Sequence, residues 1–368
     1  MTRHVVVVGA GPAGLAAAIH LARRDLAVTV IDRASSPPDK ACGEGLMPSG
    51  LGQLETMGVR ARLGPEDCHP LEGVRYVQED GQSATGRLPA PGGLGIRRTA
   101  LTRALTETAE EAGVRIAWNC RLQSHHCGPE GIRLETSGGP LEAGLLVAAD
   151  GLHSPVRQRA GLHSETGDGR RFGVRRHYRV APTSPFVEVH LAEGREAFVT
   201  PVGRDLVGLA FLWDRRRWTP DGEPAATFDR LLEGFPRLAE RFRAAEPASN
   251  VQGAGPLAQA TSAVVARRLV LAGDAAGYVD AITGEGLSLA FQAAAALGAV
   301  APDALERGAT PESLAPYARA HARLFRRYAL VTNAVLAIAR RPRLRRPLIR
   351  LLGKQPALLD RLVAWGLG

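Results

Sequence analysis

The sequence is poor in aromatic residues and almost without lysine. Aromatic side chains make up 5% of the 368 residues, and Lys40 and Lys354 are the only lysines although the net charge is +9. Surfaces that bind nucleic acid interleave basic with aromatic side chains. The scarcity of aromatic residues therefore argues against nucleic acid as a partner, and we attribute the excess of arginine to biased codon usage.

Cysteine is also scarce, and the four cysteines form no C-x-x-C pair. Such spacing predicts a reducing, cytoplasmic environment. His125, His126 and Cys127 could supply metal ligands, but no second cluster completes a tetrahedral set. We therefore expect no metal site and predict that these three residues form a turn between strands.

Long apolar runs are missing too. No run approaches the roughly 20 residues that a membrane-spanning helix requires. An apolar run follows Arg3 and His4, but its glycines and the lack of a small-residue cleavage site argue against a signal peptide. The 45% hydrophobic and 23% charged residues are typical of a globular protein, and the length predicts two or three lobes.

Residues 5–32 predict a βαβ unit. Residues 5–8 are four consecutive valines, residues 13–24 have the small side chains of a packed helix, and residues 27–31 form a second apolar run. A G-x-G-x-x-G turn joins the first strand to the helix. The combination indicates a dinucleotide site rather than a plain βαβ core.

Each glycine of this turn has a physical task. Gly9 permits the tight turn, Gly11 lets backbone N–H groups approach a pyrophosphate, and Gly14 lets the helix lie close to the sheet. Asp32 ends the second strand, where its carboxylate can accept the hydroxyl hydrogens of a ribose. A 2'-phosphate would be repelled there.

The next segment is a loop rich in glycine and proline. Pro37 and Pro38 exclude helix, and residues 42–45 (Cys-Gly-Glu-Gly) would let the backbone approach a ligand, unless they form a plain surface loop. Residues 71–88 alternate around an Asp-Gly pair and predict a β-hairpin.

The α/β pattern returns at Gly95. Residues 95–113 predict an amphipathic helix. Arg97 and Arg98 are expected just before it, and one of them can meet a phosphate unless both are solvated. Residues 114–123 predict a strand. A hairpin-like segment then leads to Asp150-Gly151 at the end of a strand, where sheets of this kind bind ligands.

The hydrophobic pattern changes at residues 170–216. They alternate in four segments separated by turn residues, which predicts an antiparallel sheet inserted into the α/β frame and the place to seek a substrate. Residues 226–245 predict helix. Residues 253–256 repeat the letters of the opening motif without a buried strand before them, so we expect no second nucleotide domain.

The last third of the chain returns to the first pattern. Residues 269–272 predict a buried strand that ends in Gly273-Asp274, and Gly284-Glu285-Gly286 opens a long small-residue helix whose amides would face an anion. The tail from Pro311 is helical and arginine-rich. We interpret it as a packing helix with an exposed charged face, with membrane-surface contact as the alternative.

Three separated motifs now stand in order: the glycine turn with Asp32, the Asp150-Gly151 pair, and Gly273-Asp274 with the glycines that follow. The set resembles FAD-dependent flavoprotein monooxygenases of the aromatic-hydroxylase type and the related geranylgeranyl-reductase-like enzymes. The resemblance covers about the first 300 residues. It implies an α/β fold: a glutathione-reductase-type FAD-binding Rossmann fold with an inserted antiparallel substrate domain and a C-terminal helical tail.

The resemblance also implies a domain division. Residues 1–70, 95–169 and 262–300 would form a discontinuous FAD-binding domain. Residues 71–94 and 170–261 would form the substrate domain, and residues 301–368 the C-terminal helical region.

Carried over residue by residue, the resemblance gives FAD a continuous set of contacts. The turn would hold the pyrophosphate, Asp32 the ribose, Arg98 the flavin end, and the first turn of the last motif's helix the flavin pyrimidine, where its dipole would stabilise the reduced state. The implied cofactor-binding residues are Gly9, Gly11, Ala13, Gly14, Asp32, Arg33, Cys42, Gly43, Arg98, Asp150, Gly273, Asp274, Gly284, Gly286 and Leu287.

Residues 40–45 resemble the reductase-type members, which carry a lysine, a cysteine and glycines on the flavin's face. Ala281 departs from the hydroxylases, where proline is common, and this leaves the subfamily open. The implied catalytic residues are Cys42, His177 and Tyr178, and the implied substrate contacts are Glu44, Glu188 and His190. Because neighbours on a strand face opposite sides, only one of His177 and Tyr178 can reach the substrate.

The leading hypothesis is an FAD-dependent monooxygenase, reduced by NAD(P)H, that hydroxylates an aromatic or lipophilic small molecule through a flavin hydroperoxide. The first alternative is a flavin-dependent reductase of prenyl-type double bonds, with Cys42 near the reacting face. The second is a flavoprotein with a non-redox role. We expect a cytoplasmic protein with a small-molecule substrate and leave its oligomeric state open.

Overall fold

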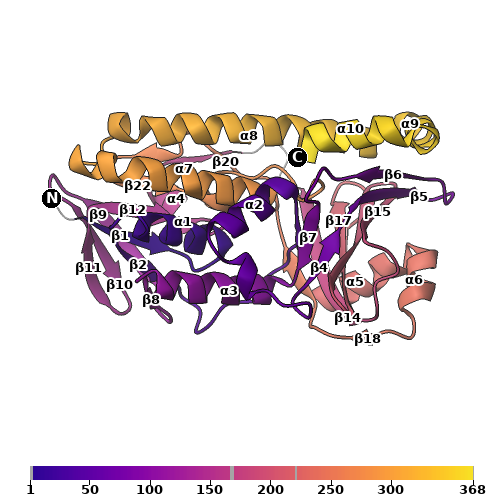
Figure 1. Ribbon diagram of the computed structural model, residues 1–368, viewed down its shortest axis with the longest axis horizontal. Helices are drawn as coiled ribbons and strands as arrows, with labels where there is room; N and C mark the ends of the chain where they lie inside the picture. Colours follow the sequence, from indigo (N-terminus) through magenta and orange to yellow (C-terminus); the bar gives the residue numbers. More distant parts are fainter. Residues whose placement is uncertain (1–2, 166–169, 220–221, 368) are drawn as a thin grey trace.

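Two β-sheets organise the computed structural model, which describes residues 3–165, 170–219 and 222–367. The first sheet occupies the left half of Figure 1 and the second the right half. The long C-terminal helices run along one edge of both halves.

The first sheet carries the glycine turn. Its order is β21-β22-β12-β1-β2-β8, and β1 pairs in parallel with β2 on one side and β12 on the other. Val5 and Val7 pack in a core with the helices α1, α3 and α7, while Val6 and Val8 pack in a second core on the other face. Burial on both faces explains the unbroken valine run. The bounds are β1 (His4–Val8), β2 (Ala27–Ile31), β8 (Arg115–Ala117), β12 (Leu145–Ala148), β21 (Val265–Ala266), β22 (Leu269–Leu271), α1 (Pro12–Ala22), α3 (Arg98–Glu111) and α7 (Gly286–Glu306).

The second sheet is largely antiparallel. Its order is β18-β14-β17-β16-β15-β5-β6, with β19 also paired to β14, and β15 pairs in parallel with β5. Helices α5 and α6 cover one face. The bounds are β5 (Gly73–Gln78), β6 (Ser83–Arg87), β14 (Arg171–Arg179), β15 (Phe186–Ala192), β16 (Arg195–Gly203), β17 (Leu206–Asp214), β18 (Glu246–Pro247), β19 (Gln252–Ala254), α5 (Pro224–Glu233) and α6 (Pro236–Phe242).

A small sheet, β3-β7-β4, joins the two halves. Its strand β3 pairs with β7, and the Ile96 N–H donates to the Glu44 carbonyl at 2.8 Å, which holds the Glu44 loop against the start of α3. The bounds of this sheet and of the remaining elements are β3 (Gly45–Leu46), β4 (Cys68–Leu71), β7 (Gly93–Ile96), β9 (Leu122–Cys127), β10 (Ile132–Thr136), β11 (Gly139–Ala143), β13 (His163–Ser164), β20 (Ala260–Thr261), α2 (Pro48–Thr56), α4 (Pro155–Arg159) and the 3-10 helices η1 (Arg60–Arg62) and η2 (Gly273–Ala276).

Three helices end the chain: α8 (Pro311–Ala339), α9 (Pro342–Lys354) and α10 (Pro356–Leu367). Figure 1 shows α8 lying over α7, with α9 and α10 continuing over β5 and β6. The helical tail expected from Pro311 is confirmed.

The expectation that no apolar run approaches membrane-spanning length is wrong for α7. This helix has 21 residues, and its most apolar 18-residue window has a mean hydropathy of 1.3. Since 56% of that window is buried inside the protein, and α7 packs between α1 and α8, we interpret it as a core helix.

Most of the predicted elements are confirmed, including the βαβ unit, the hairpin of β5 and β6, and the four long antiparallel strands. Three local predictions are wrong. Residues 114–123 form parts of two strands, β8 and β9, rather than one. The helix predicted from Gly95 begins at Arg98, because Gly95 and Ile96 end β7.

The third wrong prediction concerns residues 125–127. This segment ends strand β9 and pairs with β10 instead of forming a turn. In the described part of the chain, no group of three His, Cys, Asp or Glu side chains could hold a metal ion. Residues 166–169, assigned from sequence to the end of a cofactor-domain segment, lie outside the described residues.

Candidate active site

The glycine turn between β1 and α1 forms an open cradle of backbone. Gly9 has φ +107°, and a Cβ there would collide with the Ala149 carbonyl. A Cβ on Gly14 would collide with the Gly9 carbonyl, so glycine is what lets α1 lie this close to β1. At Gly11 the nearest atom to an added Cβ is Arg98 Nη2 at 3.7 Å. Space therefore remains in front of the backbone, where a phosphate can approach the start of α1.

Asp32 ties the end of β2 to this turn. Its Oδ2 accepts from the Ala10 N–H and its Oδ1 from the Ala34 N–H, both at 2.8 Å. A carboxylate oxygen has two lone pairs, so each oxygen can still accept a ribose hydroxyl. Arg33, next in the chain, is exposed.

Ionisable groups line the rest of the cradle. Burial raises the pKa of Asp274, although Arg98 and Lys40 oppose the shift. Burial also raises the pKa of Asp150, whose Oδ2 accepts from the Val156 N–H at 3.1 Å while its buried Oδ1 has no partner. The buried Nε of Arg98 also has no partner. Buried polar atoms are normally paired, so these atoms fit a site that receives a polar ligand.

The first turn of α7 closes the cradle. Gly284 has φ +70°, and Gly273, with φ +58°, lies so close to Ala13 that an added Cβ would collide with it. Gly286 and Leu287 begin the helix, so their N–H groups have no partner within it. Glu285 precedes them; burial raises its pKa to about 8, against the opposing charge of Arg327.

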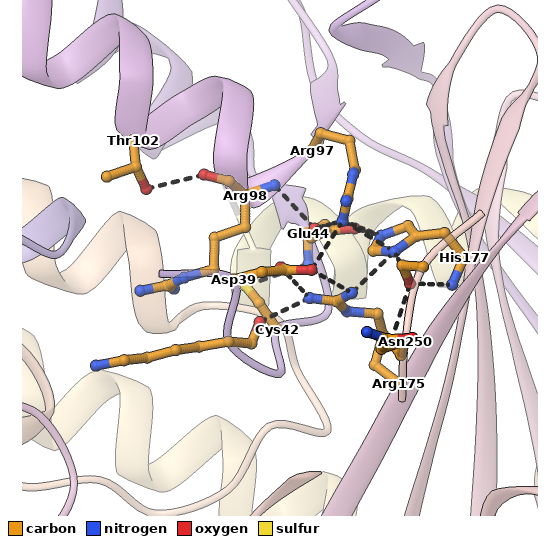
Figure 2. Close-up of polar contacts among 11 residues, drawn as sticks. Asp39, Cys42, Glu44, Arg97, Arg98, Thr102, Arg175, His177 and Asn250 are labelled. Atoms are coloured by element: carbon orange, nitrogen blue, oxygen red, sulfur yellow. Dashed lines mark hydrogen bonds and ion pairs between the residues drawn. The ribbon is translucent and has the colours of Figure 1, made fainter. Parts of the chain in front are cut away.

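Beside this cradle lies a buried cluster of charged groups around His177, shown in Figure 2. His177 comes from β14, Glu44 from the loop before β3, and Arg97 from the residue before α3. Arg175 is two residues before His177 and so shares its face of the sheet. Its Nη2 donates to Asp39 Oδ1 at 2.6 Å.

The contacts of His177 define its protonation. Its Nδ1 lies 2.8 Å from Arg175 Nη1 and 2.9 Å from Arg97 Nη1, and these guanidinium groups can only donate. Its Nε2 lies 2.5 Å from Glu44 Oε2. Burial lowers the pKa of His177, although Glu44 opposes the shift. The imidazole is therefore neutral, accepts at Nδ1 and donates its Nε2–H to Glu44.

Glu44 is ionised in this arrangement. Burial would raise its pKa, but the hydrogen bond from His177 and the nearby Arg175 guanidinium hold it below the usual range. Its Oε1 also accepts from the Arg98 N–H at 2.8 Å. With Asp39 and Glu44 anionic and Arg97 and Arg175 cationic, the cluster is neutral overall.

Cys42 lies between the cradle and the cluster. Burial raises the pKa of its thiol, with the Arg98 guanidinium opposing the shift, so the thiol stays protonated near neutral pH. The Glu44 N–H donates to Cys42 Sγ at 3.4 Å. Burial raises the pKa of Tyr278, ahead of α7, and Cys42 is close enough to add to the shift. Gly43 is exposed.

An apolar face adjoins the cluster. Side chains of β15 and β17 form a buried core on the His177 side of the second sheet. The residue before α2, strand β4 and the loop before α7 add side chains to the same core. This core, called here the apolar face, includes Met47, Leu71, Val187, Val189, Leu212 and Ile282, with Phe198, Tyr278 and Ala281 partly buried against it.

The FAD-binding-domain family model matches residues 2–332 of the chain. The chain belongs to this family. It is an FAD-dependent oxidoreductase, and NAD(P)H as reductant is typical of such enzymes.

Curated relatives fall into two kinds. The menaquinone reductase of Mycobacterium tuberculosis is 30% identical over 311 residues, which cover 78% of this chain and 74% of that one. Digeranylgeranylglycerophospholipid reductase 1 of Methanothermobacter thermautotrophicus is 30% identical over 335 residues, covering 86% and 81%. The 6-methylpretetramide 4-monooxygenase of Streptomyces rimosus is 29% identical over 328 residues, covering 82% and 76%.

Solved structures show the same fold. A flavoprotein/dehydrogenase from Cytophaga hutchinsonii matches with a TM-score of 0.84 at 16% identity, covering 99% of this chain and 92% of that one. The open backbone at Gly11 and the unpartnered Asp150 Oδ1 and Arg98 Nε fit FAD in the cradle. The glycine turn, Asp32, Arg98, Asp274 and the first turn of α7 are the groups that would hold it.

Tyr178 does not belong to this site. Alternation along β14 turns it to the opposite face from His177, where its ring packs against Phe228 and Phe242 of α5 and α6, with ring centroids 6.3 and 4.9 Å away. The expectation that only one of the pair reaches the substrate side therefore selects His177, and the catalytic role given to Tyr178 is corrected.

Glu188 and His190 are also on the wrong face for substrate contact. Glu188 lies opposite Val199, which packs in the core under α5 and α6, so both side chains point to those helices. Glu188 accepts from His190 Nε2 at 3.0 Å and from Arg241 of α6 at 3.0 Å. The pair ties α6 to the sheet, and its expected substrate role is corrected.

Three members of the cluster were not predicted from the sequence. Arg175 could have been found, because strand alternation places it on the face of His177. Asp39 and Ser249 lie in loops that no periodicity marks; Ser249 Oγ is 3.0 Å from His177 Nδ1. Arg97 was noted only as a companion of Arg98.

Proposed function

We propose that the chain is a reductase that uses bound FAD to saturate a carbon–carbon double bond in a lipophilic, prenyl-type substrate. The observation that carries the proposal is the place of the Cys42 thiol, protonated and half-buried where the cradle, the charged cluster and the apolar face meet. When bound, reduced FAD supplies a hydride to one carbon of the double bond.

The other carbon of the double bond must then receive a proton. The Cys42 thiol can donate it, and the Glu44 N–H at 3.4 Å and the Arg98 guanidinium would stabilise the thiolate that remains. His177 and Ser249 connect the cluster to a surface pocket that Ser249 and Asn250 line, through which protons can be replaced. The substrate thus gains one hydride and one proton, and the cofactor is reduced again by NAD(P)H or another donor.

The apolar face supports a lipophilic substrate. Its side chains include Met47, Leu71 and Val187, and Tyr278 and Ala281 bring the loop before α7 to the same core. The relatives named as menaquinone reductase and digeranylgeranylglycerophospholipid reductase support the same substrate class.

A second candidate is a monooxygenase that hydroxylates an aromatic or lipophilic molecule. It is favoured by the similarity to 6-methylpretetramide 4-monooxygenase, and an apolar face also suits chemistry that water would quench. In this reaction the neutral His177 and the Cys42 thiol would again accept and donate protons.

Anaerobic turnover separates the two candidates. The protein, reduced under argon, is given detergent-solubilised prenylated quinones and lipids, and products are analysed by mass. We expect a product richer by two hydrogen atoms without oxygen. A product that forms only with oxygen and carries one added oxygen atom would overturn the reductase proposal in favour of monooxygenation.

Substitution tests the role of Cys42. We expect Cys42→Ala to retain FAD and to lower turnover roughly a hundredfold, the size of a lost general acid. Cys127→Ala is the matched control, because that exposed thiol lies at the end of β9. Unchanged kinetics in Cys42→Ala would restrict the loop to a structural role.

We also propose the domain division expected from the sequence. Residues 1–70, 95–169 and 262–300 would form the cofactor domain of glutathione-reductase type, which agrees with the membership of the first sheet. Residues 71–94 and 170–261 would form the inserted substrate domain, which agrees with the pairing of β5 and β6 to β15. Residues 301–368 would form the C-terminal helical region.

For its location, we propose a cytoplasmic protein that meets a membrane surface peripherally. The arginine-rich helices after Pro311 would make the contact. Such contact would bring a lipophilic substrate within reach of the site.

A further inference from the structure

Exposed large apolar side chains are concentrated on the last three helices. Among the described residues, all six that are exposed lie on α8, α9 or α10, with exposed fractions of 40% to 62%. They are Leu330, Leu344, Leu351, Leu358, Leu362 and Trp365. Single exposed apolar side chains scattered over a surface need no explanation, but a contiguous apolar patch marks an interaction site.

The spacing of these residues makes one outward stripe on each helix. On α9 the stripe is Leu344, the half-buried Leu348 and Leu351, and on α10 it is Leu358, Leu362 and Trp365. Both sets follow the i, i+4, i+7 pattern of a single helix face.

A second apolar stripe on each helix faces inward. It contains Ile349 and Leu352 on α9, and Leu359 and Val363 on α10. The inward stripes already attach the helices to β6, so the outward ones are not needed for packing.

The segment that contains α9 and α10 is strongly basic. Residues 340–367 contain eight basic side chains and one acidic side chain, Asp360, whose Oδ1 accepts from the Arg87 N–H at 2.7 Å. Arg343, Lys354 and Arg361 are exposed and form no ion pair among the described residues. Basic side chains therefore border the outward apolar stripes.

The helices are held in fixed orientation. Arg345 is fully buried, and its Nη1 donates to the Ala339 carbonyl at 3.0 Å while its Nη2 donates to Glu79 Oε2 at 3.2 Å. Arg350 Nε donates to Gln82 Oε1 at 3.1 Å. The outward stripes thus belong to a preformed surface rather than to a loose tail.

We propose that this surface, formed by the outward sides of α9 and α10 with Leu330 of α8, docks on an anionic lipid bilayer. Leucine and tryptophan side chains would enter the interface between headgroups and acyl chains, and the basic rim would meet lipid phosphates. A second copy of this chain fits less well, since an isologous contact would bring two basic rims together.

The bilayer contact would place lipid next to the apolar face. The inward stripes of α9 and α10 belong to the same continuous buried core as Met47, Val187 and Leu212. This inference deepens the proposed membrane contact and rests on that part of the proposed function, but on neither candidate reaction.

Vesicle binding tests the surface without any substrate. The FAD-loaded protein is sedimented with vesicles of phosphatidylcholine alone or mixed with phosphatidylglycerol. We expect binding to the anionic vesicles, weakened by salt. The triple substitution Arg343→Glu, Lys354→Glu, Arg361→Glu should lower the partition coefficient roughly tenfold or more, as should Leu351→Ser, Leu362→Ser, Trp365→Ser. Charge reversals at the exposed Arg24, Arg121 and Arg204 are the matched control and should bind like the parent.

Three outcomes would overturn the proposal: no binding of the parent to anionic vesicles, binding that survives both triple substitutions, or a dimer in sedimentation velocity that the serine variant abolishes. Flavin content and melting temperature confirm that each variant is folded. Turnover of detergent-solubilised substrate in the charge variant separates failure of docking from failure of the proposed reaction.

Discussion

At the scale of single residues, a neutral histidine lies between an anion and two cations. The 2.5 Å contact of His177 Nε2 with Glu44 and the 2.8 Å contact of its Nδ1 with Arg175 set one tautomer. Because the positive and negative charges around it balance, their mutual attraction offsets part of the cost of burying the cluster. His177 Nδ1 also lies 3.0 Å from Ser249 Oγ, with which it can exchange a proton.

Gly11 provides the sharpest test of cofactor binding. The nearest protein atom to an added Cβ is 3.7 Å away, so a larger side chain fits the protein itself but fills the space left for a pyrophosphate. We expect Gly11→Val to fold and to lose FAD, measured as flavin absorbance after gel filtration. Gly52→Val, on α2 with nothing within 4 Å, is the control. A Gly11→Val protein that stays fully yellow would refute the assignment.

The glycine turn was predictable from sequence because each glycine answers a local steric need. His177 could be singled out from the sequence as a candidate site residue, but its partners come from loops and from a helix start far along the chain. Asp39 lies in a proline-containing loop with no periodicity, so nothing in the sequence indicates that it would meet Arg175. Tyr178, Glu188 and His190 were misassigned because the sequence does not say which face of a strand is turned to the cofactor.

At the scale of elements, α8 packs on α7 and carries a buried histidine. His321 is 4% exposed, and its ring stacks on Phe325 with centroids 5.7 Å apart. Burial lowers the pKa of His321 to about 4. The folded protein therefore keeps this imidazole neutral where the unfolded chain would protonate it.

This shift gives stability that is present above pH 6.5 and lost as the pH falls towards 4, because only the unfolded chain then gains a proton. The loss at this site is roughly 3 kcal/mol when complete. We expect His321→Leu to flatten the fall in melting temperature between pH 7 and pH 4.5. His126→Gln, at an exposed position, should keep the parent's slope. An equally steep slope in His321→Leu would show that other groups carry the pH dependence.

A second element-scale prediction concerns the attachment of α9. Arg345→Ala removes a fully buried guanidinium and leaves Glu79 with fewer partners. We expect a loss of about 2 kcal/mol, the size of a lost hydrogen bond from a charged group, because Glu79 is itself partly exposed. We also expect faster hydrogen exchange in residues 342–367 with the flavin spectrum unchanged. Arg343→Ala, exposed on the same helix, should exchange like the parent. Unaltered protection in Arg345→Ala would mean that apolar packing alone holds these helices.

At the scale of the whole molecule, the sequence predicted both sheets and the order of the motifs, since hydrophobic periodicity reports local structure well. The parallel pairing of β15 with β5 could not be predicted from the sequence, because no local pattern links residues 186–191 with residues 73–78. The same limit applies to the apolar face, which gathers side chains from segments far apart in the sequence. The pairing of strands far apart in the sequence depends on tertiary packing, and the hydrophobic periodicity of one sequence does not reveal that packing.

The position of β22 in the first sheet has a consequence for synthesis. This strand and α7 come from residues 269–306, yet they complete the sheet and cradle begun by residues 4–32. A chain that emerges from the ribosome N-terminus first can form β1, α1 and β2 early, but it must wait for all the strands of the second sheet before its first sheet is whole. Cofactor capture therefore belongs to the last stage of folding, and a nascent chain that stops before α7 should carry no flavin.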